Sequence, residues 1–257
     1  MGVVTFRFYA DLNDFLPPPR RQATLVCELK ARASVKDLIE AHGVPHPEVD
    51  LVVVNGRPVD FSYVVSPGDR VSVFPAFAAL DTPVDARLLP AAPREHRFVA
   101  DAHLGRLAAY LRLLGFDTLY RNDYGDAELA AVSANEDRTL LTRDVGLLKH
   151  ALVQRGAFLR HTEPGRQLSE VVARFRLSGH ARPFTRCLRC NTPLRRVDKD
   201  RVSSMVPPRA RERYEEYALC VTCGRVFWKG THYERMRRLV DAVVSHTDTT
   251  DDPVTQP

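Results

Sequence analysis

The hydrophobic pattern of the first 75 residues predicts a small mixed sheet. Apolar and polar positions alternate over residues 3–8, which is typical of a half-buried strand. Ser34 and Asp37 form a capping-box-like helix start, and the helix is expected to stop at Gly43. Apolar runs predict three further strands, at residues 25–29, 51–54 and 70–74, with a tight turn at Asn55-Gly56. The order ββαββ indicates an α+β sheet within one small module.

Strand and helix patterns then alternate between residues 97 and 177. The predicted strands are residues 97–100, 116–120, 139–142 and 157–160. The predicted helices are residues 104–114, 126–134, 145–154 and 168–177, with Gly115 as a C-cap after the first. This βαβαβαβα order predicts an α/β domain with a mostly parallel, three-layer sheet and helices on both faces. No glycine-rich phosphate loop follows any strand, which argues against the usual nucleotide-binding sites.

Composition divides the chain further. Residues 78–95 are rich in Ala and Pro, which is typical of an interdomain linker. We therefore expect an N-terminal module at residues 1–77, the α/β domain at 96–178, a cysteine-containing module with a C-terminal helix at 179–244, and a disordered tail at 245–257.

Four cysteines near the C-terminus carry the strongest chemical signal. Two CxxC pairs, Cys187/Cys190 and Cys220/Cys223, are separated by residues 191–219. Each pair can place two thiolates on one tight turn, and two such turns close an all-sulfur tetrahedral site that suits structural Zn²⁺. The alternatives are two disulfides or a redox CxxC. Disulfides are disfavoured because no signal peptide is evident, and Cys27, in an apolar stretch, is expected to be a core residue.

Charge is distributed unevenly along the chain. The net charge of +5 conceals 16 Lys and Arg against 6 Asp and Glu within residues 176–240. The basic excess therefore lies on the cysteine module, which favours a polyanionic partner over a merely basic surface. No apolar run approaches the ~20 residues of a membrane span. We expect no membrane association and a reducing, cytoplasmic location.

Carboxylates follow three of the four predicted strands of the α/β domain. Asp101 follows the first strand, Asp123 and Asp126 the second, and Asp144 the third. Because the carboxyl ends of parallel strands share one edge, these acids are expected to form one site for Mg²⁺ or Mn²⁺. Each acid alone also has a structural explanation as a helix cap or turn residue. Glu128 is the alternative to Asp126.

Several residue strings together resemble a known family. They are the run from Phe98 to Tyr120, which contains Asp101-Ala-His-Leu-Gly-Arg-Leu, then Asn122-Asp-Tyr-Gly-Asp126, Arg138-Thr-Leu-Leu-Thr-Arg-Asp144 and the two CxxC pairs. They are similar to the Mut-seven C-terminal RNase domain, which implies a PIN-like nuclease fold with an appended zinc ribbon. By matching position, the resemblance implies catalytic roles for Asp101, Asp126 and Asp144, with Asp123 a fourth candidate. His103 departs from the apolar residue expected there and is assigned no role.

The first module resembles the β-grasp, ubiquitin-like fold of sulfur carriers, which bacterial members of this family often carry in front. Those carriers end in a flexible Gly-Gly, whereas here Val73-Phe-Pro-Ala-Phe77 continues into further chain. Carrier chemistry is therefore absent, and we expect the module to bind a protein partner or act as a scaffold.

The resulting hypothesis is a Mg²⁺- or Mn²⁺-dependent ribonuclease with a zinc ribbon that assists RNA binding. The predicted RNA contacts are Arg106 and Arg143 near the acids, and Arg195, Arg196 and Lys199 on the ribbon. Phe227, Trp228 and Tyr233 offer stacking planes, although they could equally pack the ribbon core. Arg112 and Arg121 are further candidates, and for Arg112 we favour a solvated surface position. The alternative is a non-catalytic RNA- or ribosome-associated adaptor in which the acids are structural.

Overall fold

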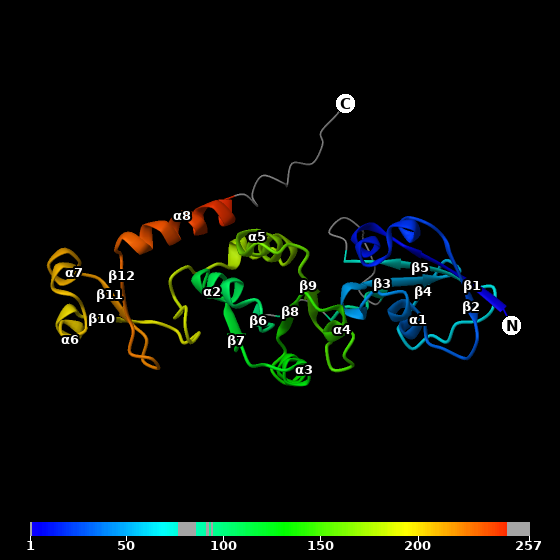
Figure 1. Ribbon diagram of the computed structural model, residues 1–257, viewed down its shortest axis with the longest axis horizontal. Coiled ribbons are helices and arrows are strands. Elements are labelled where there is room, and N and C mark those ends of the chain that lie inside the picture. Colours follow the sequence, from blue (N-terminus) through cyan, green and yellow to red (C-terminus); the bar gives the residue numbers. More distant parts are fainter. Residues whose placement is uncertain (1, 77–85, 91–92, 94, 246–257) are drawn as a thin grey trace, which may run out of the picture. The chain divides into compact units, whose positions relative to one another are not determined.

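The computed structural model describes residues 2–76, 86–90, 93 and 95–245, and its chain divides into two compact units (Figure 1). One unit comprises Met1–Glu95 with Gly125–Phe158, and the other comprises His96–Tyr124 with Leu159–Pro257. Most of the predicted linker and all of the predicted tail except Ser245 lie outside the described residues.

A five-stranded sheet forms the N-terminal module, in the order β2-β1-β5-β3-β4. Its strands are β1 (Gly2–Phe8), β2 (Leu25–Leu29), β3 (Leu51–Val54), β4 (Arg57–Val59) and β5 (Arg70–Phe74). Only the β1–β5 pair is parallel among the strand pairs described for this sheet. The inward positions of the alternating strands, among them Val4, Phe6, Val52 and Val73, are fully buried with Ile39 of α1 (Val35–Ala41). The pattern predicted four of these five strands and α1, whereas β4, which is only three residues long, was not predicted.

Local turn chemistry explains the boundaries of these elements. Ser34 and Asp37 form the predicted capping box, in which Asp37 N donates to Ser34 Oγ (3.1 Å) and Ser34 N donates to Asp37 Oδ2 (3.2 Å). Asn55 and Gly56 both have positive φ, as a type I′ hairpin turn requires. Short 3₁₀ segments complete the module: η1 (Ala10–Phe15), η2 (Pro18–Arg20) and η3 (His46–Glu48).

Four short strands follow in two pairs, β6 with β7 in one unit and β8 with β9 in the other. They are β6 (Arg97–Ala100), β7 (Asp117–Tyr120), β8 (Thr139–Thr142) and β9 (Gly156–Phe158). The β6–β7 pair and the β8–β9 pair are both parallel, as the alternation of strands and helices predicted.

Helices flank these strands within each unit. In one unit, α2 (Gly105–Leu113) packs against β6, β7 and α5 (Pro164–Arg174). In the other, α3 (Asp126–Asn135) and α4 (Val145–Leu148) pack against β8. Gly115, with φ of 93°, ends α2 as predicted; a Cβ there would lie 2.2 Å from Arg182 O.

Two predicted helices differ from the structure. The helix expected at residues 145–154 ends at Leu148, because the later amides bond three residues back (His150 N to Leu147 O, Val153 N to His150 O) and the chain turns. The helix expected at residues 168–177 begins at Pro164. The Glu163 carboxylate accepts from Gly165 N and Arg166 N, and Pro164 occupies the first helical position, where proline is favoured.

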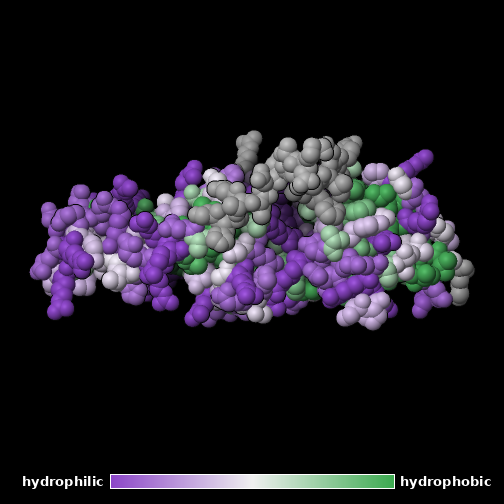
Figure 2. Space-filling model, turned by 90° about the horizontal axis from the view of Figure 1, so that it is seen from above, coloured by the Kyte–Doolittle hydropathy of each residue, from purple (hydrophilic) through white to green (hydrophobic). Residues whose placement is uncertain are grey.

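The C-terminal module contains a three-stranded antiparallel sheet of β10 (Arg195–Val197), β11 (Tyr217–Leu219) and β12 (Val226–Trp228). Two short helices, α6 (Lys199–Val202) and α7 (Pro208–Arg213), follow β10; Val202, Val206 and Tyr217 form a small core. After β12, α8 (Thr231–Ser245) packs against α5 and η5 (Ser178–His180). The face of this module seen in Figure 2 is mostly hydrophilic, in keeping with its charge.

Candidate functional site

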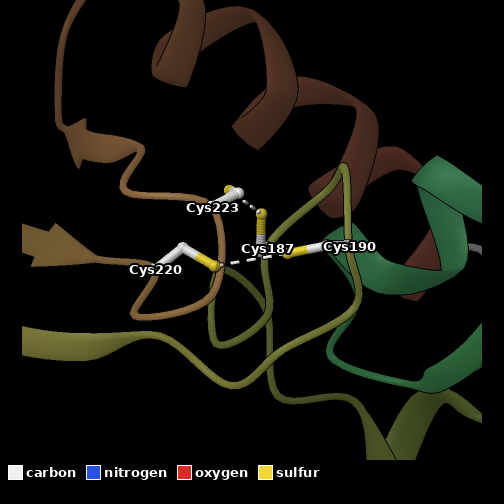
Figure 3. A group of neighbouring side chains, drawn as sticks. All are labelled: Cys187, Cys190, Cys220 and Cys223. Atoms are coloured by element: carbon white, nitrogen blue, oxygen red, sulfur yellow. Dashed lines mark hydrogen bonds between the residues drawn. The ribbon is translucent and has the colours of Figure 1, made fainter.

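Two loops bring the four predicted cysteine ligands together. Their Sγ atoms all lie within 4.8 Å of one another, and the side chains point toward a common centre (Figure 3). Cys187 Sγ lies 3.7 Å from Cys223 Sγ, and Cys190 Sγ lies 3.3 Å from Cys220 Sγ. All four cysteines are free thiols, so this geometry does not support the alternative of two disulfides. Sulfurs around a tetrahedral Zn²⁺, with Zn–S of ~2.3 Å, lie roughly 3.8 Å apart. This cluster could therefore hold a metal ion such as zinc.

The two loops share one backbone design. In the first, Cys187 N donates to Thr192 O and Asn191 N donates to Cys187 O; in the second, Cys220 N donates to Arg225 O and Gly224 N donates to Cys220 O. Asn191 and Gly224, each directly after a second cysteine, have φ of 67° and 68°. Only Gly and, less often, Asn adopt this left-handed conformation readily. The Asn and Gly at equivalent positions are thus a sequence signal for paired metal-binding knuckles.

Two of the four thiols, those of Cys187 and Cys190, have strongly perturbed pKa values. Burial raises the pKa of Cys187 to about 12. Burial also opposes ionisation of Cys190, but its hydrogen bonding with Thr192 and Cys220 outweighs burial and lowers its pKa to about 6. A divalent cation held by the four sulfurs would favour their thiolate forms.

Arg112 anchors the first knuckle, which corrects the expectation of a solvated surface residue. This α2 side chain is only 4% exposed. Its Nη1 donates to Leu188 O (3.1 Å) and Arg189 O (2.9 Å), both between the cysteines, while its Nε donates to Thr118 O (2.9 Å). Burial lowers the pKa of the guanidinium, and Cys187 and Cys190 oppose that shift. Arg112 therefore serves the structure and is not available to phosphate.

Asn191 makes a second link between the knuckle and β7. Its Oδ1 accepts from Thr118 N (3.1 Å), and its Nδ2 donates to Asp117 Oδ1 (2.7 Å). Arg186 supports the same corner by donating to Gly115 O and Asn191 O. The cysteine module thus provides a partner for the backbone amide of Thr118 in β7.

Asp101 directly follows β6 and is nearly buried, at 7% exposed. Its Oδ1 accepts from Ala102 N (2.6 Å), and its carbonyl accepts from Leu104 N, which closes the turn into α2. His103 Nδ1 lies 3.5 Å from Asp101 Oδ1 on a half-exposed ring. Gly105 is required here, because a Cβ would lie 2.7 Å from the Tyr120 hydroxyl, which donates to Ala102 O. Asp101 therefore occupies a fixed position after its strand.

Asp123 belongs to the same unit as Asp101 and is exposed. Arg121 binds both of its oxygens, from Nε and Nη2 at 2.9 Å each, and stacks over the Tyr124 ring. This hydrogen bonding holds the pKa of the Asp123 carboxyl below its usual range. The carboxylate already has a cationic partner, in keeping with the structural alternative for this residue.

Asp126 and Asp144 lie in the other unit. Asp126 is the exposed first residue of α3, and Glu128 is two residues further along the helix. Asp144 caps α4: Gly146 N and Leu147 N donate to its Oδ1 at 2.6 and 3.2 Å. One Asp144 oxygen is therefore engaged by backbone, and the residue is exposed to solvent. The convergence of all four aspartates on one ion remains a prediction.

Comparison with protein families shows to which family the chain belongs. The model of the Mut7-C RNAse domain matches residues 96–240. The chain belongs to the Mut7-C RNase domain family. A second model, the Mut7-C ubiquitin, matches residues 1–81 and identifies the N-terminal module as ubiquitin-like. No curated protein and no solved structure matches the chain.

The ubiquitin-like module of this Mut7-C protein makes specific contacts with β9 and α4. Phe158 N, on β9, donates to the buried carboxylate of Glu48 (2.6 Å). The His46 ring bridges the Glu40 carboxylate (Nδ1 to Oε1, 2.7 Å) and Val153 O (Nε2 to O, 2.8 Å). Lys149 Nζ, just after α4, donates to Glu40 O. These contacts join segments about 110 residues apart, and local sequence patterns did not reveal them.

The predicted RNA-contacting residues occupy accessible positions. Arg106 is exposed on α2, Arg195 and Arg196 are exposed on β10, and Arg143 and Lys199 are half-buried. Lys199 Nζ also pairs with Glu215 Oε1 at 2.5 Å. No described helix combines the length and apolar character that crossing a membrane requires.

Proposed function

We propose that this protein is a metal-dependent ribonuclease of PIN-like fold. The observation that carries the proposal is the match to the Mut7-C RNAse domain over residues 96–240, which covers more than half of the chain. Its substrate would be RNA, hydrolysed at phosphodiester bonds. The free thiols suit a reducing cytoplasm, and a protein partner is proposed for the ubiquitin-like module.

Asp101, Asp123, Asp126 and Asp144 would hold the catalytic Mg²⁺ or Mn²⁺. Support comes from Asp101 and Asp144, which closely follow β6 and β8, each a member of a parallel strand pair, and offer the oxygen ligands that these ions prefer. Bound there, the ion would activate water and neutralise charge on the leaving oxygen. Asp101 is oriented by Ala102 N and Asp144 by the first amides of α4, so both carboxylates are positioned before substrate arrives. Arg106 and Arg143 would contact RNA phosphates.

Cys187, Cys190, Cys220 and Cys223 would hold one structural Zn²⁺ and make the C-terminal module a zinc ribbon. Four thiolates complete the tetrahedral coordination, so this metal would leave no open position for catalysis. The ribbon would assist RNA binding through its basic surface, which includes Arg195, Arg196 and Lys199.

The test is incubation of the pure protein with end-labelled RNA, with Mn²⁺ and with Mn²⁺ plus excess EDTA. The proposal expects cleavage that requires added Mn²⁺ and stops with EDTA. Intact RNA in both arms, together with RNA binding, would instead support the non-catalytic adaptor. Cleavage unaffected by EDTA would contradict the metal assignment.

A further inference from the structure

A cavity of about 840 Å³ lies in the C-terminal module, between the sheet and the residues of α8. Its volume falls in the range of roughly 300–1,000 Å³ that is typical of ligand pockets. The residues that line it come from several segments, among them the sheet strands, the loop at residues 183–188, α6 and α8. All of these segments belong to one unit of the chain.

Strand register shows which side chains share each face of the sheet. Arg196 pairs with Ala218, and Ala218 pairs with Phe227, so these three side chains project from one face across β10, β11 and β12. All three line the cavity. Tyr217 and Trp228 belong to the other face and pack with Val202 and Val206, although both also border the cavity. The small Ala218 therefore leaves space between a cationic and an aromatic side chain.

Aromatic side chains also form the opposite wall. Phe184 and Tyr233 line the cavity with ring centroids 4.4 Å apart and ring planes inclined by 37°. Both rings are only half-buried, as is Phe227. Half-buried aromatic rings that face an open cavity are the surfaces on which unpaired bases stack.

The charges around the cavity leave Arg196 available. Lys199 pairs with Glu215, and Lys229 pairs with Glu216 at 2.7 Å. Arg186 is occupied by backbone carbonyls. Arg196 is exposed and has no ion pair within the described part of the chain. The Glu216 carboxylate, whose pKa is lowered first by Lys229 and also by Arg196, is an electrostatic neighbour of this guanidinium. A phosphate at the cavity mouth would therefore meet Arg196 without breaking an ion pair.

From this arrangement we infer that the cavity binds an unpaired base of single-stranded RNA, stacked on Phe227 and flanked by a phosphate on Arg196. The inference rests on the proposed function, because it takes RNA as the ligand. It adds that the RNA is single-stranded and that this cavity is the binding site. Paired bases are not available for stacking, so a double helix does not fit this mode. The neighbouring Arg195 faces away from Arg196, because successive residues of a strand point to opposite faces.

The experiment measures anisotropy of a fluorescein-labelled decamer of 2′-O-methyluridine, which resists cleavage, over a salt series with the full-length protein. Phe227→Leu is expected to weaken binding roughly tenfold, since one base loses its stacking plane. Arg196→Gln is expected to weaken binding and flatten the log–log salt slope by about 0.7, the value for one phosphate contact on a single strand. Arg209→Gln, at an exposed position of α7 that does not line the cavity, removes the same charge and is the matched control, with little change expected.

A blunt RNA duplex, labelled likewise, is expected to bind at least tenfold more weakly than the decamer. Equal effects of Arg209→Gln and Arg196→Gln, with none from Phe227→Leu, would overturn the site. Equal affinity for duplex and decamer would also overturn it. Circular dichroism and urea unfolding of each variant identify any loss of fold, and Phe227→Tyr, which keeps an aromatic ring, must then restore binding. Cleavage of unmodified RNA is assayed separately. Loss of cleavage alone contradicts the proposed function, whereas unchanged binding in the variants contradicts only this site.

Discussion

At the scale of single residues, buried polar side chains hold the metal-binding knuckle and the cores in place. Arg112 gives three hydrogen bonds to main-chain carbonyls, two of them inside the Cys187–Cys190 loop. A lysine would keep the charge but lose the planar fork that reaches all three acceptors.

Arg112→Lys is therefore expected to lower the free energy of unfolding by about 1–3 kcal/mol, because buried carbonyls lose charged donors. Urea unfolding followed by circular dichroism measures the change. Arg106→Lys, on the exposed side of the same helix, is the control and is expected to stay within about 0.5 kcal/mol of the wild type. Equal stabilities of the two variants would show that the Arg112 contacts contribute nothing.

His42 links stability to pH through its burial against Phe6 and Phe8, with ring centroids 5.0 and 5.6 Å away. Burial, followed by the charge of Arg20, lowers the pKa of His42 below 6.5. The neutral ring is thus favoured by folding, and its contribution to stability is present above pH 6.5. Below that pH the unfolded state binds protons that the folded state does not, so stability falls until the folded pKa is passed.

His42→Phe is expected to remove part of the stability loss between pH 7 and pH 5. Burial lowers the pKa of His46 and His96 in the same direction, so the remaining part should persist. Urea unfolding across this range measures it, and the difference between the two proteins at pH 8 gives the packing effect alone. A pH dependence identical to that of the wild type would contradict the role of His42.

At the scale of elements, the outer strand β9 meets the ubiquitin-like module through Glu48. A backbone amide left free on a strand can pair with a strand of another molecule. Here the amide of Phe158 donates a hydrogen bond to the Glu48 carboxylate instead. The acid is only 2% exposed, so its removal would leave that amide without its partner.

Glu48→Ala is expected to cost about 1–3 kcal/mol of unfolding free energy, the penalty for an unsatisfied buried donor. Glu48→Gln keeps an oxygen acceptor and should recover much of the loss. Hydrogen exchange at Phe158 should be faster in the alanine variant, since its amide proton loses protection. Unchanged exchange at Phe158 would mean that this contact is absent in solution.

The two CxxC loops are the clearest element-scale case for metal-coupled folding. Cys220→Ser removes one of four ligands, and ligand binding energy is folding energy in such modules. We expect one zinc per chain in the wild type and little or none in the variant, measured by elemental analysis of the purified proteins. Wild-type protein without zinc, or with four freely reactive thiols, would refute a structural zinc site.

At the scale of the whole molecule, periodicity and residue spacing predicted the helices, strands and cysteine ligands better than they predicted the long-range contacts. The sequence revealed the capping box at Ser34, strand β8 and each of the two CxxC pairs, because each of these signals lies within a few neighbouring residues. The sequence did not reveal the roles of Arg112, Asn191 and Glu48. Their hydrogen-bond partners lie about 75 to 110 residues away along the chain, and local patterns do not show which side chains become buried. The early end of α4 likewise reflects the turn that buries Val153, which local propensity does not show.

The proposed function separates RNA binding from catalysis along the chain. The basic excess lies within residues 176–240, whereas the four aspartates lie within residues 101–144. Neutralising Arg195, Arg196 and Lys199 together should weaken RNA binding and flatten the salt slope by up to about 2, if all three touch phosphate. The cleavage rate at saturating RNA should change little. An unchanged affinity and slope would place RNA binding elsewhere.

The most direct test of the central claim is the single-turnover cleavage rate of labelled RNA in Mn²⁺ by Asp101→Asn and Asp144→Asn. Asparagine keeps the oxygen that accepts from Ala102 N, and at Asp144 it remains a good helix cap, so both folds should persist. Asp60→Asn, in an exposed turn of the ubiquitin-like module, is the matched control. The account predicts a loss of roughly a hundredfold or more for the first two variants and none for the control. Wild-type rates for both Asp101→Asn and Asp144→Asn would contradict it.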